Sequence, residues 1–168
     1  VVPRAPAMTT LVWNGLDDER AIALLCAAMG TPFEVTGAAH RPADSSDATS
    51  RTMLRLEGFI EQLDYRSDRL AKAFAAYGVP DRLDAATAAR RWQEVRDLEP
   101  LVEPRQRAVW RLSVPPRTGA SLVGRIKSGC DCQALYDWSG GLIWLAVDET
   151  DDAAAALIRA AVHETGGH

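Results

Sequence analysis

The order of secondary-structure elements repeats once along the chain, and this repeat constrains the fold more than any single motif. Runs of apolar and β-branched residues predict strands at Thr9–Leu16, Phe33–Ala39 and Thr52–Leu56. Helical spacing predicts one helix between Asp17 and Gly30 and a second from Phe59 to Tyr77. The first half is therefore expected to run strand, helix, strand, strand, helix.

The second half returns to the same order. Its predicted strand, short helix, two strands and alanine-rich helix lie at Val109–Val114, Thr118–Ser128, Cys132–Trp138, Leu142–Val147 and Asp151–Thr165. Ser139, Gly140 and Gly141 separate the two middle strands. Because glycine supplies the positive φ angles of tight turns, these two strands are expected to form a hairpin.

Strand-helix-strand-strand-helix-strand is the ferredoxin-like pattern, in which helices cover one face of an antiparallel sheet. Each half has this pattern with its last strand absent or hidden. We therefore predict one α+β domain over residues 1–168, built from duplicated ferredoxin-like halves at about 9–78 and 108–168, with a helical connector at 79–107. The start at Val1 and the stop at His168, where a final strand is due, predict a fragment truncated before that strand.

Composition excludes several classes of function. The net charge of -4, with acidic and basic residues interleaved, is unlike a nucleic-acid surface. No apolar run approaches the roughly 20 residues of a membrane span. Three cysteines suggest a reducing compartment, and Cys130 and Cys132 lack the second ligand pair of a zinc site. No metal site is expected.

Several short blocks, in order along nearly the whole chain, carry a family resemblance. They are LVWNGLDDERAIALLCAAMG, VTGAAHRP, LRLEGF, VWRLSVPP and ALYDWSGGLIWLAV. With these blocks the chain resembles the C-terminal (cap) domain of the FAD-binding E subunit of glycolate oxidases, within the FAD-linked oxidase family. The chain has no G-x-G-x-x-G and no P-loop. The resemblance therefore implies that an N-terminal FAD-binding domain is absent from it.

The resemblance also implies a function and partners. The parent protein would be a cytoplasmic flavoprotein that oxidises glycolate, a small 2-hydroxy acid, to glyoxylate with FAD. Its partners would be a homologous flavin subunit and an iron–sulfur subunit, through which it could attach to a membrane. The fragment alone is expected to be inactive. The alternative is a non-catalytic ferredoxin-like module that binds ligands or proteins. A glycine-rich FAD-binding half encoded directly before Val1 would distinguish the two.

Two arginines are candidates for binding a substrate carboxylate or steadying the flavin, because arginine offers a bidentate fork. Arg111, on the strand that opens the second half, is the first choice. Arg55 is the second and is expected to share a strand face with Glu57. The competing interpretation is that these arginines lie on a solvated sheet face.

Aromatic residues and one histidine complete the candidate set. Tyr136 and Trp138 are expected to share one strand face, with Asp137 on the other, either near the flavin or packed as core. His40 ends a strand and could act as a base, although no partner is evident near it in sequence. The competing interpretation is a solvated histidine at the edge of a loop.

Overall fold

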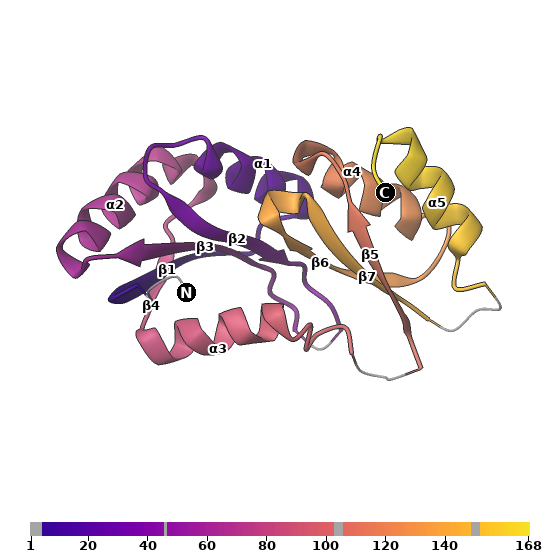
Figure 1. Ribbon diagram of the computed structural model, residues 1–168, viewed down its shortest axis with the longest axis horizontal. Helices are drawn as coiled ribbons and strands as arrows, with labels where there is room; N and C mark the ends of the chain where they lie inside the picture. The colour runs from indigo at the N-terminus through magenta and orange to yellow at the C-terminus, as the bar shows by residue number, and fades with distance from the viewer. Residues whose placement is uncertain (1–4, 46, 103–105, 149–151) are drawn as a thin grey trace.

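The computed structural model describes residues 5–45, 47–102, 106–148 and 152–168, which form a seven-stranded antiparallel sheet and five α-helices (Figure 1). The strands are β1 (Ala7–Asn14), β2 (Val35–Arg41), β3 (Arg51–Gly58), β4 (Asp81–Leu83), β5 (Ala108–Ser113), β6 (Cys132–Asp137) and β7 (Leu142–Val147). The helices are α1 (Asp18–Met29), α2 (Ile60–Ala73), α3 (Ala85–Arg96), α4 (Gly119–Lys127) and α5 (Ala155–Glu164). Short 3₁₀ turns occupy Ala75–Tyr77, Pro116–Thr118 and Trp138–Gly140.

The sheet order β4-β1-β3-β2-β6-β7-β5 confirms the duplicated ferredoxin-like arrangement. The first half contributes β4, β1, β3 and β2. In the second half, β5, β7 and β6 take the positions that β1, β3 and β2 take in the first. The halves join between β2 and β6, where His40 pairs with Tyr136. The predicted hairpin is also confirmed, because β6 pairs with β7 from Cys132–Val147 to Asp137–Leu142.

The last strand of the first half is present but very short. β4 pairs with β1 at Asp81–Leu83, within the segment predicted as connector. The corresponding position in the second half lies beside β5. There Ser113 and His168 exchange two backbone hydrogen bonds of 2.7 and 2.9 Å along the strand edge. The predicted start of the last helix at Asp151 lies outside the described residues, and α5 begins at Ala155.

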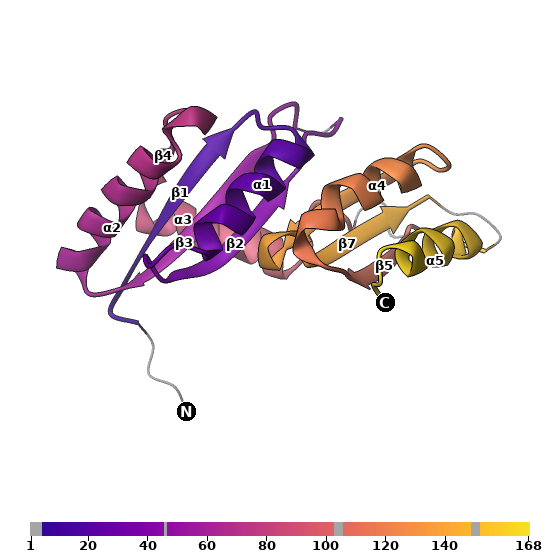
Figure 2. The same ribbon diagram turned by 90° about the horizontal axis from the view of Figure 1, so that it is seen from above.

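Four helices, α1, α2, α4 and α5, cover one face of the sheet, as expected for this pattern (Figure 2). Their apolar sides and the facing strand residues form the main core, which includes Trp13, Leu25, Leu54, Leu122 and Ile143. This core extends through both halves. The four helices therefore form one layer, which covers the same face of the sheet in both ferredoxin-like halves.

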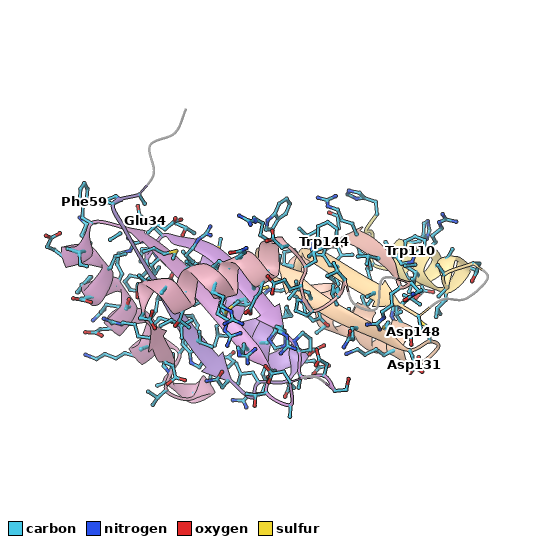
Figure 3. The ribbon with its side chains drawn as sticks, turned by 90° about the horizontal axis from the view of Figure 1, so that it is seen from below. Glu34, Phe59, Trp110, Asp131, Trp144 and Asp148 are labelled. Atoms are coloured by element: carbon cyan, nitrogen blue, oxygen red, sulfur yellow. The ribbon has the colours of Figure 1, made fainter. Side chains whose placement is uncertain are left out.

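The connector helix α3 lies on the opposite face of the sheet, over the first half (Figure 1). Asp84 caps its first turn by accepting hydrogen bonds from the backbone N–H groups of Ala86 and Thr87. Val95 then packs in a second, smaller core, and the indole of Trp92 donates a 2.9 Å hydrogen bond to Thr10 of β1. This face is thus covered by a helix in the first half, while the second half presents its strands (Figure 3).

No helix in the described part of the chain has the length and apolar character needed to cross a membrane.

Candidate functional site

A groove of about 660 Å³ lies between α3, the strands of the first half and the tip of the β6–β7 hairpin. Its walls include Met29, Arg55, Trp92, Arg96, Asp137 and Trp138. A concave, mixed apolar and polar surface of this size is typical of small-molecule sites. The groove therefore brings together two candidates from the sequence, Arg55 and Trp138. It also contains the carboxyl group of Asp137, which was not a candidate.

Arg55 is held in the groove by stacking and by hydrogen bonds. Its guanidinium lies 4.9 Å from the ring centre of Trp92, within the range of a cation–π contact. Its Nη2 donates a 3.0 Å hydrogen bond to the Thr36 carbonyl, and Nε lies 3.4 Å from Glu57. Nη1 has no hydrogen-bond partner among the described residues. Arg55 is thus fixed in orientation and keeps donors for an anion.

Gly37 of β2 provides the room for this arrangement. A Cβ at this position would lie 3.1 Å from the Trp92 ring and 3.2 Å from both Cβ and Nε of Arg55. Such contacts are closer than side chains normally tolerate, so any larger residue would displace the stacked pair. The Gly37 in the VTGAAH block is therefore a packing requirement of the groove.

Asp137 ends β6 on the groove side of the sheet. Burial raises the pKa of its carboxyl, against the lowering effects of a hydrogen bond from the Trp138 backbone and of the Arg55 charge. The Trp138 N–H donates to this carboxylate at 2.8 Å and so holds the start of the hairpin turn. A cation and a carboxyl with a raised pKa therefore lie in the same groove.

The hairpin turn holds an unusual backbone conformation. Trp138, Ser139 and Gly140 have φ angles of 49°, 60° and 92°. The left-handed region is costly for residues with a side chain, and such strain is concentrated at functional sites. Trp138 is 64% exposed and lines the groove. The turn therefore displays a large aromatic side chain at the groove wall.

This turn corrects one expectation from the sequence. Tyr136 and Trp138 do not share a strand face, because β6 ends at Asp137 and Trp138 belongs to the turn. Tyr136 is fully buried in the main core, whereas Trp138 lines the groove on the opposite side of the sheet. The two aromatic candidates therefore belong to different environments.

Arg111 and Glu57 lie on the same sheet face as Arg55, but Arg111 is remote from the groove. Arg111 is exposed on β5, 6.0 Å from the ring centre of Trp144, which Figure 3 labels on the strands of the second half. β3 and β5 are four strand spacings apart, roughly 19 Å. Arg55 and Glu57 are neighbours, as expected, but Arg111 cannot act on a small ligand together with them.

His40 is completely buried and has partners that its sequence neighbourhood did not reveal. Its Nδ1 lies 2.9 Å from the Thr52 hydroxyl, and its Nε2 lies 3.3 Å from Asp18. Tyr136 donates a 2.6 Å hydrogen bond to the other oxygen of the same carboxylate. These four side chains form the junction cluster, which joins the two halves at the β2–β6 contact.

Two members of the junction cluster, His40 and Tyr136, are closed to solvent, whereas the Asp18 carboxylate is about 25% exposed. His40 and Tyr136 are 0% exposed, so no substrate atom reaches the imidazole or the phenol. Burial and the Asp18 charge raise the pKa of Tyr136 far above its usual range, which keeps the phenol protonated as a donor. We assign His40 and Tyr136 to holding the halves together, and the groove becomes the candidate site.

The described ranges hold no cluster of metal ligands, and two helix ends that follow positive-φ glycines are unsuited to a phosphate group. No three His, Cys, Asp or Glu side chains there come close enough to hold a metal ion. Two positive-φ glycines, Gly15 and Gly58, shortly precede long helices, but Asp17 and Asp18 follow the first and Glu61 the second. These carboxylates oppose phosphate binding at the helix ends. The N-termini of α1 and α2 therefore do not fit the pyrophosphate of FAD.

Solved structures of the same fold include several enzymes named for small organic compounds. Alkyldihydroxyacetonephosphate synthase matches with TM-scores of 0.62 and 0.64 at 10% and 9% identity, over 99% of this chain. p-Cresol methylhydroxylase matches with 0.59 at 12% identity over 97%, and 4-ethylphenol oxidase from Gulosibacter chungangensis with 0.61 at 12% over 99%. This chain spans only 40–46% of the length of those proteins.

The chain has the fold of the C-terminal domain of FAD-linked oxidases. At 9–12% identity the likeness concerns the fold alone. No protein-family model and no curated protein sequence matches the chain.

Proposed function

We propose that this chain is the substrate-side domain of a flavin-dependent 2-hydroxy-acid oxidoreductase of the glycolate oxidase type. The observation that carries the proposal is the FAD-linked oxidase fold over nearly the whole chain, combined with an oriented arginine in an open groove. FAD would be the cofactor, and its phosphates would be bound by another part of the complete protein, since acidic residues occupy the N-termini of α1 and α2.

In this proposal Arg55 binds the substrate carboxylate. Its unpartnered Nη1 supplies a charge-assisted hydrogen bond, and the Trp92 ring and the Thr36 carbonyl fix its plane. Arg111 has a comparable aromatic neighbour but no enclosing groove. Arg55 therefore takes precedence over Arg111, which was the first choice from the sequence.

The assembly follows from the same family resemblance. A homologous flavin subunit and an iron–sulfur subunit would receive the electrons, and the complex would reside in the cytoplasm or attach to a membrane through those partners. The strands of the second half, which no helix covers on the α3 side among the described residues, offer a surface for the rest of the protein (Figure 3).

Steady-state kinetics of the complete protein that contains this chain tests the assignment. Arg55→Gln should raise the KM for glycolate by about 10- to 100-fold, since a charged hydrogen bond contributes about 1.5–3 kcal/mol. Arg111→Gln removes the same charge from the same sheet face and should leave the KM for glycolate within about twofold of its value in the natural protein. If Arg111→Gln alone impairs the enzyme, the carboxylate role belongs to Arg111. If neither has an effect, the carboxylate is bound elsewhere and the assignment is wrong.

A further inference from the structure

We propose that the groove beneath α3 binds a 2-hydroxy acid with an aromatic side chain, of the 3-phenyllactate type, in preference to glycolate. This inference rests on the proposed function only for the 2-hydroxy-acid class. The binding itself depends on the residues of this chain, so it can be measured without flavin.

The size of the groove favours the larger substrate. About 660 Å³ lies within the range of pockets that enclose drug-sized molecules. Glycolate is a two-carbon acid and would leave most of this volume to water. A phenyl group attached through one methylene fills the groove further and removes apolar surface from water, at about 25 cal/mol per Å².

The walls of the groove offer both a charged group and apolar groups, and such a ligand requires both. Arg55 offers Nη1 to a carboxylate on the strand side. Arg96, the other arginine at the groove, already pairs with Asp97 through bonds of 2.7 and 2.9 Å. Met29, Ala89 and Val95 add apolar groups to the walls, beside the polar Thr36, Gln93 and Ser139. A guanidinium with one donor nitrogen open, beside apolar side chains, suits one carboxylate with an apolar tail.

The exposed Trp138 supplies a surface for stacking an aromatic ring. It is 64% exposed, although burial of a tryptophan is strongly favourable. Its left-handed backbone keeps it at the groove wall instead of on β6 with Tyr136. The opposite aromatic, Trp92, already has Arg55 over its ring. A ligand ring on Trp138, with its carboxylate at Arg55, would bridge the two walls.

Titration of the 168-residue chain with 3-phenyllactate and with glycolate, followed by NMR of the tryptophan indole N–H signals, tests the proposal. We expect 3-phenyllactate to bind at least about tenfold more tightly than glycolate and to shift the signals of Trp92 and Trp138. Arg55→Gln and Trp138→Ala should each weaken binding about tenfold or more. Arg159→Gln, which removes a stacked arginine from Trp110 instead, is the matched control and should bind normally.

Several results would overturn the inference. They are equal affinities for the two acids, shifts confined to Trp110 or Trp144, and unchanged binding in Arg55→Gln. If Arg55→Gln fails to fold, Arg55→Lys keeps the charge but loses the fork, and it should still weaken 3-phenyllactate binding.

The outcome separates this inference from the proposed function. If the complete protein oxidises glycolate but the chain does not bind 3-phenyllactate, the inference fails and the function stands. If the chain binds 3-phenyllactate but the complete protein has no flavin and oxidises neither acid, the binding site stands and the function fails.

Discussion

The Tyr136 hydroxyl donates a 2.6 Å hydrogen bond to the Asp18 carboxylate, and this contact links residues that are 118 positions apart. Tyr136 lies on β6 of the second half, and Asp18 begins α1 of the first. His40 binds the other oxygen of the same carboxylate and pairs with Tyr136 in the sheet. The junction cluster thus fixes the two ferredoxin-like halves relative to one another, and with them the groove that both halves line.

Removal of this hydroxyl should destabilise the domain. Tyr136→Phe leaves the partly buried Asp18 carboxylate without one donor, and the expected loss is about 1–2 kcal/mol in the free energy of unfolding. Urea denaturation followed by tryptophan fluorescence measures it. Tyr65→Phe is the control, because Tyr65 is 62% exposed, and it should change stability by less than about 0.5 kcal/mol. Equal losses of stability in the two variants would show that the Tyr136 hydroxyl does not hold the two halves together.

Asp18 should make the fold sensitive to acid. Burial raises the pKa of Asp18, but hydrogen bonds from His40 and Tyr136 outweigh it and hold the pKa below the usual 3.8. A carboxyl whose pKa is lower in the folded state stabilises the fold above its unfolded pKa and loses that contribution as pH falls. Asp18→Asn should therefore be less stable than the natural chain at pH near 7, and the difference should shrink below about pH 4. A difference that is constant across this range in urea denaturation would contradict the assignment.

Two glycines with positive φ should respond very differently to alanine. At Gly140, with φ 92°, a Cβ would lie 2.8 Å from Ile22 Cδ1 and 2.9 Å from the Pro116 carbonyl. At Gly78, with φ 105°, it would meet nothing within 4 Å. Gly78→Ala should cost about 1–3 kcal/mol for backbone strain alone, because its φ of 105° and ψ of 179° suit glycine only. Gly140→Ala should cost at least about 2 kcal/mol more, because its Cβ also has close contacts. Thermal unfolding of the two variants provides the comparison, and similar melting temperatures would show that the turn does not pack as described.

Trp138 should show opposite effects on stability and on binding. Trp138→Gly relieves a left-handed φ of 49° at a site where the side chain is mostly exposed, so stability should rise by about 1 kcal/mol. The same change removes the aromatic wall of the groove and should weaken 3-phenyllactate binding. Calorimetric unfolding and ligand titration of one sample measure both. A variant that loses stability while binding normally would refute a functional reason for the strained turn.

The sequence predicted the elements of the fold better than their contacts. Local patterns were sufficient for the repeated element order and for the β6–β7 hairpin. β4 was missed because it has three residues between Pro80 and the helix cap Asp84, too few to show a pattern. The side of the sheet on which α3 lies depends on packing against β1 and could not be read from its own residues.

The candidate site was only partly predictable. The alternation in the RLEG block correctly put Arg55 beside Glu57, since side chains two apart on a strand share a face. Trp138 was assigned to the wrong environment because the turn starts one residue earlier than Ser139. The partners of His40 are Thr52, 12 residues after it, and Asp18, 22 residues before it, and only the folded chain brings them together. Burial raises the pKa of Asp137, and a single sequence does not reveal this burial.

The most direct test of the central claim is the visible absorption of the complete protein that contains this chain, recorded without oxygen before and after addition of a 2-hydroxy acid. We expect an oxidised flavin spectrum that bleaches on addition of glycolate or 3-phenyllactate. The Arg55→Gln variant should bleach only at much higher acid concentration. A purified protein without flavin absorption, or a flavin that neither acid reduces, would contradict the proposed function.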